Sequence, residues 1–275
     1  MASIDFYRLQ ASEDNGIEYG NLVFKPLKVR QFALYQAAKP SFEIMQTSLS
    51  PKYAVLSWCN CLDALDRDSQ KEGKQTAFLQ WALSVLAVSI GLEPYNENGQ
   101  LHYHLYEVRD NDGNIAAIVI GLNNPTILQM NDMDEIRKII AALNVYEIPD
   151  EKWNPELVRA QRYTAKSSHN DLDVNFDDLR YSVALNAGVK PNDIWDWSIK
   201  DFIKIQDAID RKLNYMIFTL ASHSGFVQFK KGNPCPSWKY TRNPEMPTEF
   251  KTIAEMDAEA KGLLGVTTQE VEELQ

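Results

Sequence analysis

Two histidines, His102 and His104, stand two residues apart in a stretch whose residue types favour a β-strand. Because side chains along a strand alternate between its two faces, both imidazoles point to the same side. Imidazole is a common metal ligand, so this pair could fill two positions of a zinc site. The neighbouring sequence offers no clear third ligand. We therefore expect both histidines to lie on an exposed face and to bind no functional metal.

The three cysteines, Cys59, Cys61 and Cys235, are an odd number and form no disulfide framework. If Cys59 and Cys61 lie on a helix, their side chains diverge by about 200° and cannot chelate one ion together. Cys235 could join them only through a fold contact that the sequence does not define. We expect packing cysteines, and no nucleophile at Cys235, because no histidine or aspartate stands near it in sequence.

A group of carboxylates stands at Asp63, Asp66, Asp68 and Glu72. Paired carboxylates can run acid–base chemistry or hold Mg²⁺. Here they are interleaved with Arg67 and Lys71, which is typical of a solvated helix face. The later acids at Asp171, Asp173, Asp177 and Asp178 do not match a calcium-binding EF-hand loop.

The sequence contains no GxxxxGK[ST], GxGxxG, GxSxG or HExxH motif. We therefore predict no catalytic residue, no metal and no cofactor. An enzyme without a recognisable motif, metal-dependent through His102 and His104, stays open as an alternative.

The composition of the chain narrows the classes of partner that the protein could bind. Of the 275 residues, 44% are hydrophobic and 24% are charged, as in a globular protein with a sizeable core. The net charge of −10 argues against electrostatic binding of nucleic acid. The most apolar run, residues 77–90, is too short to span a bilayer, and the start lacks the apolar region of a signal peptide. We expect a cytoplasmic protein that binds neither nucleic acid nor membrane.

The first 125 residues are predicted to form an α+β region. A short strand at 22–24 precedes a helix at 28–39, which Pro40 should end. A second helix is expected over 51–68, starting at Pro51, and a third over 77–90, ended by Gly91. The run 101–121 is predicted to be a β-hairpin turning at residues 111–114, and to pack on helices or pair with an early strand near 4–9 or 17–24.

The remainder is predicted to be mostly helical, which gives a mainly α member of the α+β class. Residues 126–240 form the helical region, with a candidate flexible linker at 160–174, and 241–275 form an acidic tail. Helices are expected at 131–144, capped by Asn131, at 175–188, ended by Gly188, and at 199–223, opened by a Ser198–Asp201 capping box and ended by Gly225. The apolar stripe of the long helix should be buried, so that Leu213→Ala costs about 2–5 kcal/mol.

The second half has a distinctive order of features. A helix ends in Gly188, the turn Asp193-Ile194-Trp195 opens a long helix, and Asp210-Arg211-Lys212 lies in its second half. The stretch ASHSGFVQFK and Trp238 follow. This order resembles tail and baseplate-hub assembly chaperones of contractile-tailed bacteriophages, over 130–275 and more weakly over 15–65. The resemblance implies a non-enzymatic assembly protein in the host cytoplasm whose partners are tail or baseplate proteins, and which could also form a homo-oligomer. A structural virion subunit of the tail or baseplate is the alternative.

Two segments are predicted to contact the partner. The arm after the long helix carries large aromatic side chains of the kind enriched at binding hot spots. The acidic tail carries apolar residues that could enter a groove on a basic partner, although the arm could instead fold back on the body and the tail could stay disordered. The predicted partner-binding residues are Phe226, Phe229, Trp238, Ile253, Met256, Leu263 and Leu264.

Overall fold

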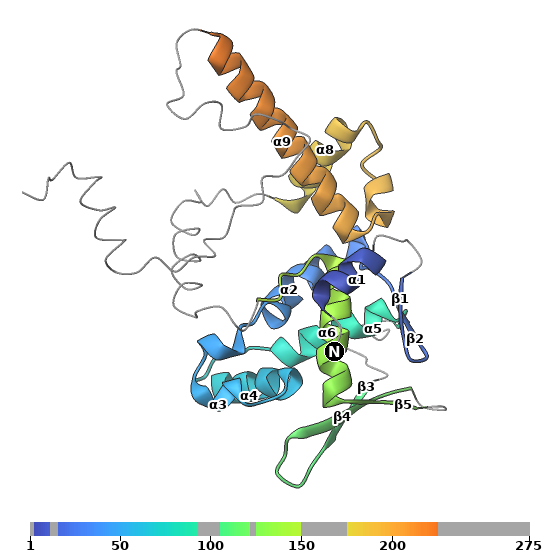
Figure 1. Ribbon diagram of the computed structural model, residues 1–275, viewed down its shortest axis with the longest axis vertical. Coiled ribbons are helices and arrows are strands. Elements are labelled where there is room, and N and C mark those ends of the chain that lie inside the picture. The colour runs from blue at the N-terminus through green and yellow to red at the C-terminus, as the bar shows by residue number, and fades with distance from the viewer. Residues whose placement is uncertain (1–2, 12–15, 93–104, 122–124, 150–174, 225–275) are drawn as a thin grey trace, which may run out of the picture. The chain divides into compact units, whose positions relative to one another are not determined.

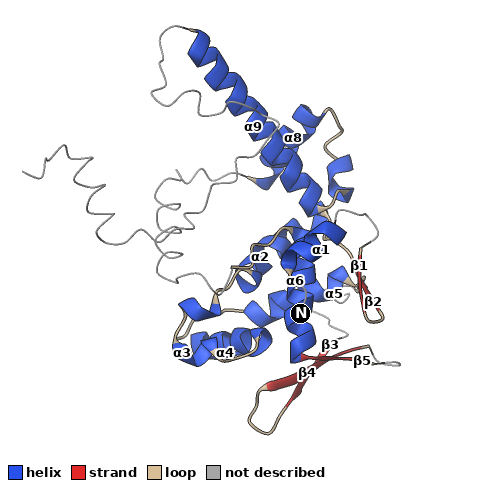
Figure 2. Ribbon diagram, viewed as in Figure 1, coloured by secondary structure: helices blue, strands red, loops and turns tan. Residues whose placement is uncertain are grey.

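The computed structural model describes residues 3–11, 16–92, 105–121, 125–149 and 175–224. It divides into two compact units, Met1–Asp210 and Arg211–Gln275. Helices dominate and the strands are short (Figures 1 and 2), which confirms the mainly helical α+β class.

Helix α2 (Phe32–Phe42) follows the 3-10 turn η1 (Val29–Gln31) and contains Pro40. The expectation that Pro40 ends this helix is wrong, because the helix runs on to Phe42. Proline removes one backbone hydrogen bond, but the side chains of Ser41 and Phe42 hold the last turn of the helix in place. Ser41 donates a hydrogen bond to the carbonyl of Phe78, and the buried Phe42 ring stacks on Tyr146.

The helix expected over 51–68 is two helices, α3 (Pro51–Ala54) and α4 (Trp58–Lys71). Pro51 does open the first, as predicted, but the continuous helix is wrong. Val55 lies at the break and is exposed, while Trp58 starts the second helix in the core. The Trp58 indole donates to the carbonyl of Ser41 at 2.8 Å, and its backbone N–H donates to Asp134.

Helices α5 (Phe78–Ser89) and α6 (Met130–Asn144) supply much of the main core. Gly91 follows α5 with φ of 84°, which confirms the predicted stop. The expected cap of α6, Asn131, is one residue inside the helix; the N-cap is Gln129, whose N–H donates to Asp132. The core also takes side chains from α1 (Ile4–Gln10) and from the antiparallel pair β1 (Ile17–Tyr19) and β2 (Leu22–Phe24).

The predicted hairpin is formed by β3 (Leu105–Arg109) and β4 (Ile115–Ile120), with Gly113 in the turn at φ of 81°. It pairs with β5 (Thr126–Gln129) in the order β3-β4-β5, and not with an early strand. Residues 4–10 are helical, and the 17–24 stretch makes its own pair. One sheet face enters the core through Ile118 and Leu128, and the other exposes Tyr106, Val108 and Ile127.

A second, smaller core cluster joins α8 (Phe176–Ala187), the 3-10 turn η3 (Asp193–Asp196) and the start of α9 (Ile199–His223). Gly188 ends α8 with φ of 70°, as predicted. The Ser198 hydroxyl accepts from the N–H of Asp201 and donates to its carboxylate, so these two residues do open α9.

The early chain is fixed to the start of α9 through backbone hydrogen bonds. The N–H of Ile199 donates to the carbonyl of Leu27 at 2.8 Å, and the N–H of Val29 donates to that of Trp197 at 2.9 Å. Val29 is fully buried in the second cluster beside Phe202. Among the helices of the described ranges, none is long and apolar enough to cross a membrane.

Candidate functional site

The carboxylates of α4 are not all on a solvated face. Asp63 and Asp66 are buried, contrary to the expectation from their charged neighbours. Asp68 is partly buried and accepts hydrogen bonds from Lys52, Lys71 and the Tyr53 hydroxyl, which hold the pKa of its carboxyl well below its ordinary value. The reason for the difference is tertiary: the strand β3 and the start of α5 come to this side of α4.

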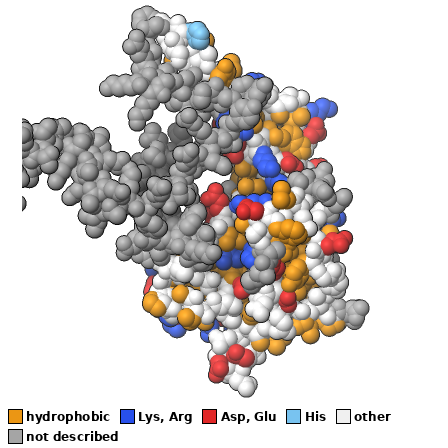
Figure 3. All heavy atoms as spheres, in the orientation of Figure 1, with side chains coloured by type: hydrophobic (Ala, Val, Ile, Leu, Met, Phe, Trp, Pro, Cys, Tyr) orange, Lys and Arg blue, Asp and Glu red, His pale blue; other side chains and the backbone are white. Residues whose placement is uncertain are grey.

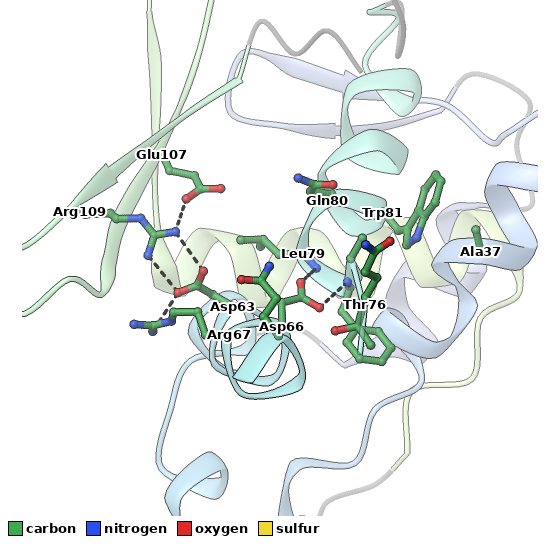
Figure 4. Close-up of a pocket in the computed structure, with 14 residues that line it drawn as sticks. Ala37, Asp63, Asp66, Arg67, Thr76, Leu79, Gln80, Trp81, Glu107 and Arg109 are labelled. Carbon is green, nitrogen blue, oxygen red and sulfur yellow. Dashed lines mark hydrogen bonds and ion pairs between the residues drawn. The ribbon is translucent and has the colours of Figure 1, made fainter. Parts of the chain in front are cut away.

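Asp63 is the centre of an ion network (Figure 4). Its two oxygens accept from the Arg109 guanidinium at 2.9 and 3.0 Å, and Arg67 approaches one of them at 2.9 Å. Arg109 also pairs with Glu107 and donates to the carbonyl of Gly113. The hydrogen bond to Asp63 raises the pKa of the Arg109 guanidinium further above its ordinary value. Two carboxylates therefore balance two guanidiniums between α4 and the hairpin.

Asp66, which lies on α4, caps the N-terminus of the next helix, α5. Its oxygens accept from the backbone N–H of Phe78 at 2.9 Å and of Leu79 at 3.0 Å. The residue at the N-cap position itself, Ala77, has no side chain able to do this. A carboxylate at a helix N-terminus also meets the favourable end of the helix dipole.

These groups border a hollow of about 840 Å³. Its walls also carry the polar side chains of Gln70, Gln75, Thr76 and Gln80 and the indole of Trp81. Both oxygens of Asp63 and both of Asp66 are already engaged by donors on the protein. A carboxylate in that state is a poor general base and a poor metal ligand. The hollow therefore has the geometry of a structural seam between α4, α5 and β3.

The cysteines of α4 are packing residues. Cys59 and Cys61 are both buried and are not joined in a disulfide. Burial raises the pKa of the Cys59 thiol well above its ordinary value, which disfavours the reactive thiolate. Within the ranges that the structure describes, no group of three or more His, Cys, Asp or Glu side chains lies close enough to hold a metal ion.

Several predicted site residues lie outside the described residues. These are the histidine pair with Cys235, the candidate linker 160–174, the acidic tail 241–275 and all of the predicted partner-binding residues: His102, His104, Phe226, Phe229, Trp238, Ile253, Met256, Leu263 and Leu264.

The second half of α9 shows a feature that sequence reasoning placed in the core. Four of its apolar side chains are exposed by 44 to 69%: Leu213, Met216, Ile217 and Leu220. We call these four residues the α9 stripe. The expectation of a buried stripe is correct for Ile199 and Phe202 and wrong for these four. Periodicity identifies which face of a helix is apolar, but it carries no information about whether anything covers that face.

The surface charges do not mark a site by themselves. On the face drawn in Figure 3, acidic and basic side chains of the described residues alternate with hydrophobic ones, and neither sign forms a continuous patch.

Comparison of the chain with protein-family models, with curated proteins and with solved structures finds no match.

Proposed function

We propose that this chain is a non-enzymatic assembly factor for the tail or baseplate of a contractile-tailed bacteriophage, and that it acts in the host cytoplasm by binding another tail protein. The order of features over 130–275 supports the choice of system. The α9 stripe supports the mode of action, and it is the observation that carries the proposal.

The stripe has the residue spacing of a helix that binds in a groove of a partner protein. Leu213, Met216, Ile217 and Leu220 stand at positions i, i+3, i+4 and i+7. These positions form one continuous face, and apolar anchors at this spacing are the recurring pattern of helix-in-groove recognition. Residues 211–224 carry two basic residues, Arg211 and Lys212, and no acid. The partner protein that fits the stripe therefore has an apolar groove with an acidic rim.

The energy of such a contact is moderate. Burying a Leu, Ile or Met side chain completely contributes about 1.5–3 kcal/mol, and roughly half of each of these side chains is still exposed. The stripe can thus supply about 3–6 kcal/mol before the costs of association. This is too little for a permanent complex on its own, and it suits a factor that must release its client.

The test is a binding experiment with defined proteins. The chain is co-expressed in turn with each tail and baseplate protein encoded by the genes beside its own. We expect one of them to form a stable complex, and Leu220→Glu to weaken that complex by about tenfold or more because it places a charge in the apolar groove.

The matched control is Leu185→Glu, a similarly exposed leucine on α8. It should bind as the parent does. Circular dichroism should show both variants folded. The proposal is abandoned if none of the tail or baseplate proteins binds, or if Leu220→Glu binds as strongly as Leu185→Glu. Mass spectrometry of finished virions separates the two roles, since a structural subunit would remain in the particle.

A further inference from the structure

We infer that residues 253–264 of the same chain cover the α9 stripe while no partner is bound, so that the protein carries its own competitor for the binding site. The inference rests on the proposed function only in naming the stripe as a binding site. The contact itself concerns the protein alone.

The first ground is the match of apolar pattern. In residues 253–264, IAEMDAEAKGLL, the side chains of Ile253, Met256 and Ala260 recur at i, i+3 and i+7, and Leu263 and Leu264 follow. A segment of this spacing presents one apolar face when helical. The α9 stripe presents the same kind of face along Leu213 to Leu220. Two such faces bury each other in the way that paired helices do.

The second ground is charge. Residues 253–264 contain three acids, Glu255, Asp257 and Glu259, and one base, Lys261, which gives 1 − 3 = −2. Residues 211–224 contain Arg211 and Lys212 and no acid, which gives +2. Opposite charges beside an apolar contact orient the two segments and select against like-charged competitors. The segment thus offers the acidic rim that we expect of the partner groove.

The third ground is the tether. Residues 225–252 connect the two segments and can span at most about 100 Å when fully extended. The part of α9 that carries the stripe, Leu213 to Leu220, is about 12 Å long at the rise of an α-helix. The segment can therefore reach any point of the stripe. A covalent tether of this kind gives an effective concentration on the order of 1 mM. An intrinsic dissociation constant of about 0.1 mM then suffices for about nine-tenths occupancy.

Regulation follows from this occupancy. A partner that binds the α9 stripe can bind only those molecules in which residues 253–264 do not cover it. When nine-tenths of the molecules have the stripe covered, the partner's apparent dissociation constant is therefore about tenfold higher. A weak or incorrect partner is rejected, whereas one with additional contacts displaces the segment.

The experiment is a cross-linking test on the full chain without any partner. Cys235 is replaced by serine, and the buried Cys59 and Cys61 are kept. Met216→Cys is combined with Met256→Cys and treated with a short bismaleimide. The matched control combines Met216→Cys with Val271→Cys, which uses the same helix position and a tail position beyond the segment. Products are separated by size and mapped by mass spectrometry.

We expect the Met216→Cys, Met256→Cys variant to cross-link within one chain severalfold faster than the Met216→Cys, Val271→Cys control. Added salt should slow the reaction, and so should the charge reversal Glu255→Lys with Glu259→Lys. Equal rates for the two variants would overturn the inference. A product of twice the chain mass at the expense of the monomeric one would also overturn it, because the occupant would then be a second copy. Neither result depends on whether a tail protein binds, so the proposed function is judged separately.

Discussion

The carboxylate of Asp63 in α4 and the guanidinium of Arg109 in β3 face each other with two hydrogen bonds, at 2.9 and 3.0 Å. Asp63 is buried, whereas Arg109 is about one-third exposed. This pair ties the hairpin to the helical core across 46 residues of sequence.

Asp63→Asn should destabilise the protein by about 1–3 kcal/mol, because two guanidiniums lose a charged acceptor while the volume is kept. Denaturant unfolding measures the effect. A double-mutant cycle with Arg109→Gln should give a coupling energy of about 0.5–3 kcal/mol. Strictly additive losses would mean that the two side chains do not act together.

Asp66→Ala should cost about 1–2 kcal/mol, because two backbone N–H groups at the start of α5 lose their acceptor. Gln70→Ala, on the exposed part of the same helix, is the control and should stay within about 0.5 kcal/mol of the parent. Thermal or urea unfolding compares the three proteins. Equal stability of both variants would show that water replaces the Asp66 cap without loss.

Val145→Gly is expected to stabilise the protein. Val145 follows α6 with φ of 60°, a left-handed conformation that costs an L-residue about 1–2 kcal/mol. Glycine removes this strain, but it also increases the conformational entropy of the unfolded chain, which offsets part of the stabilisation. The expected net stabilisation is about 0.5–1 kcal/mol. An unchanged or lower midpoint of unfolding would mean that the valine side chain contributes more packing than its partial exposure indicates.

Phe202 and Leu213 lie on the same helix and should respond differently to truncation. Phe202 is fully buried in the second core cluster, so Phe202→Ala should cost about 3–5 kcal/mol. Leu213 is 44% exposed, so Leu213→Ala should cost about 1 kcal/mol or less. Chemical denaturation checks both. A loss of several kcal/mol at Leu213 would restore the original expectation that its side chain belongs to a core.

The alkaline stability of the protein should depend on Tyr35. Burial, with the nearby carboxylates of Glu43 and Glu147, raises the pKa of Tyr35 from 10.0 to about 12. The unfolded chain therefore ionises first, so the stability contributed by this group is complete below pH 10 and is lost as the pH rises through 12. The free energy of unfolding of Tyr35→Phe should fall less steeply between pH 10 and 12 than that of the parent. Parallel curves would rule out this contribution.

Local signals in the sequence were sufficient where one or two residues determine the backbone. Gly91 and Gly188 mark helix ends, residues 111–114 mark the hairpin, and Ser198 with Asp201 marks the start of α9. These features depend on glycine conformation and on short-range hydrogen bonds, which neighbouring residues alone can specify.

Features that depend on distant partners were not predictable in this way. The carboxylates of α4 resemble a solvated face until Arg109 and the start of α5 are placed beside them. Pro40 should end a helix, yet the contacts of Ser41 and Phe42 extend it. For the same reason, the sequence defined the apolar face of α9 but not the point at which the core stops covering it.

The hydrogen bonds that join Leu27 and Val29 to Ile199 and Trp197 impose an order on folding during synthesis. Val29 leaves the ribosome long before Trp197 and Phe202 exist, and at about 5–20 residues per second the interval is roughly 10–30 s. Much of the main core can form during this time, since nearly all of its members lie before residue 149. The backbone groups of Leu27 and Val29 therefore gain these partners only after Trp197 and Ile199 have been added to the nascent chain.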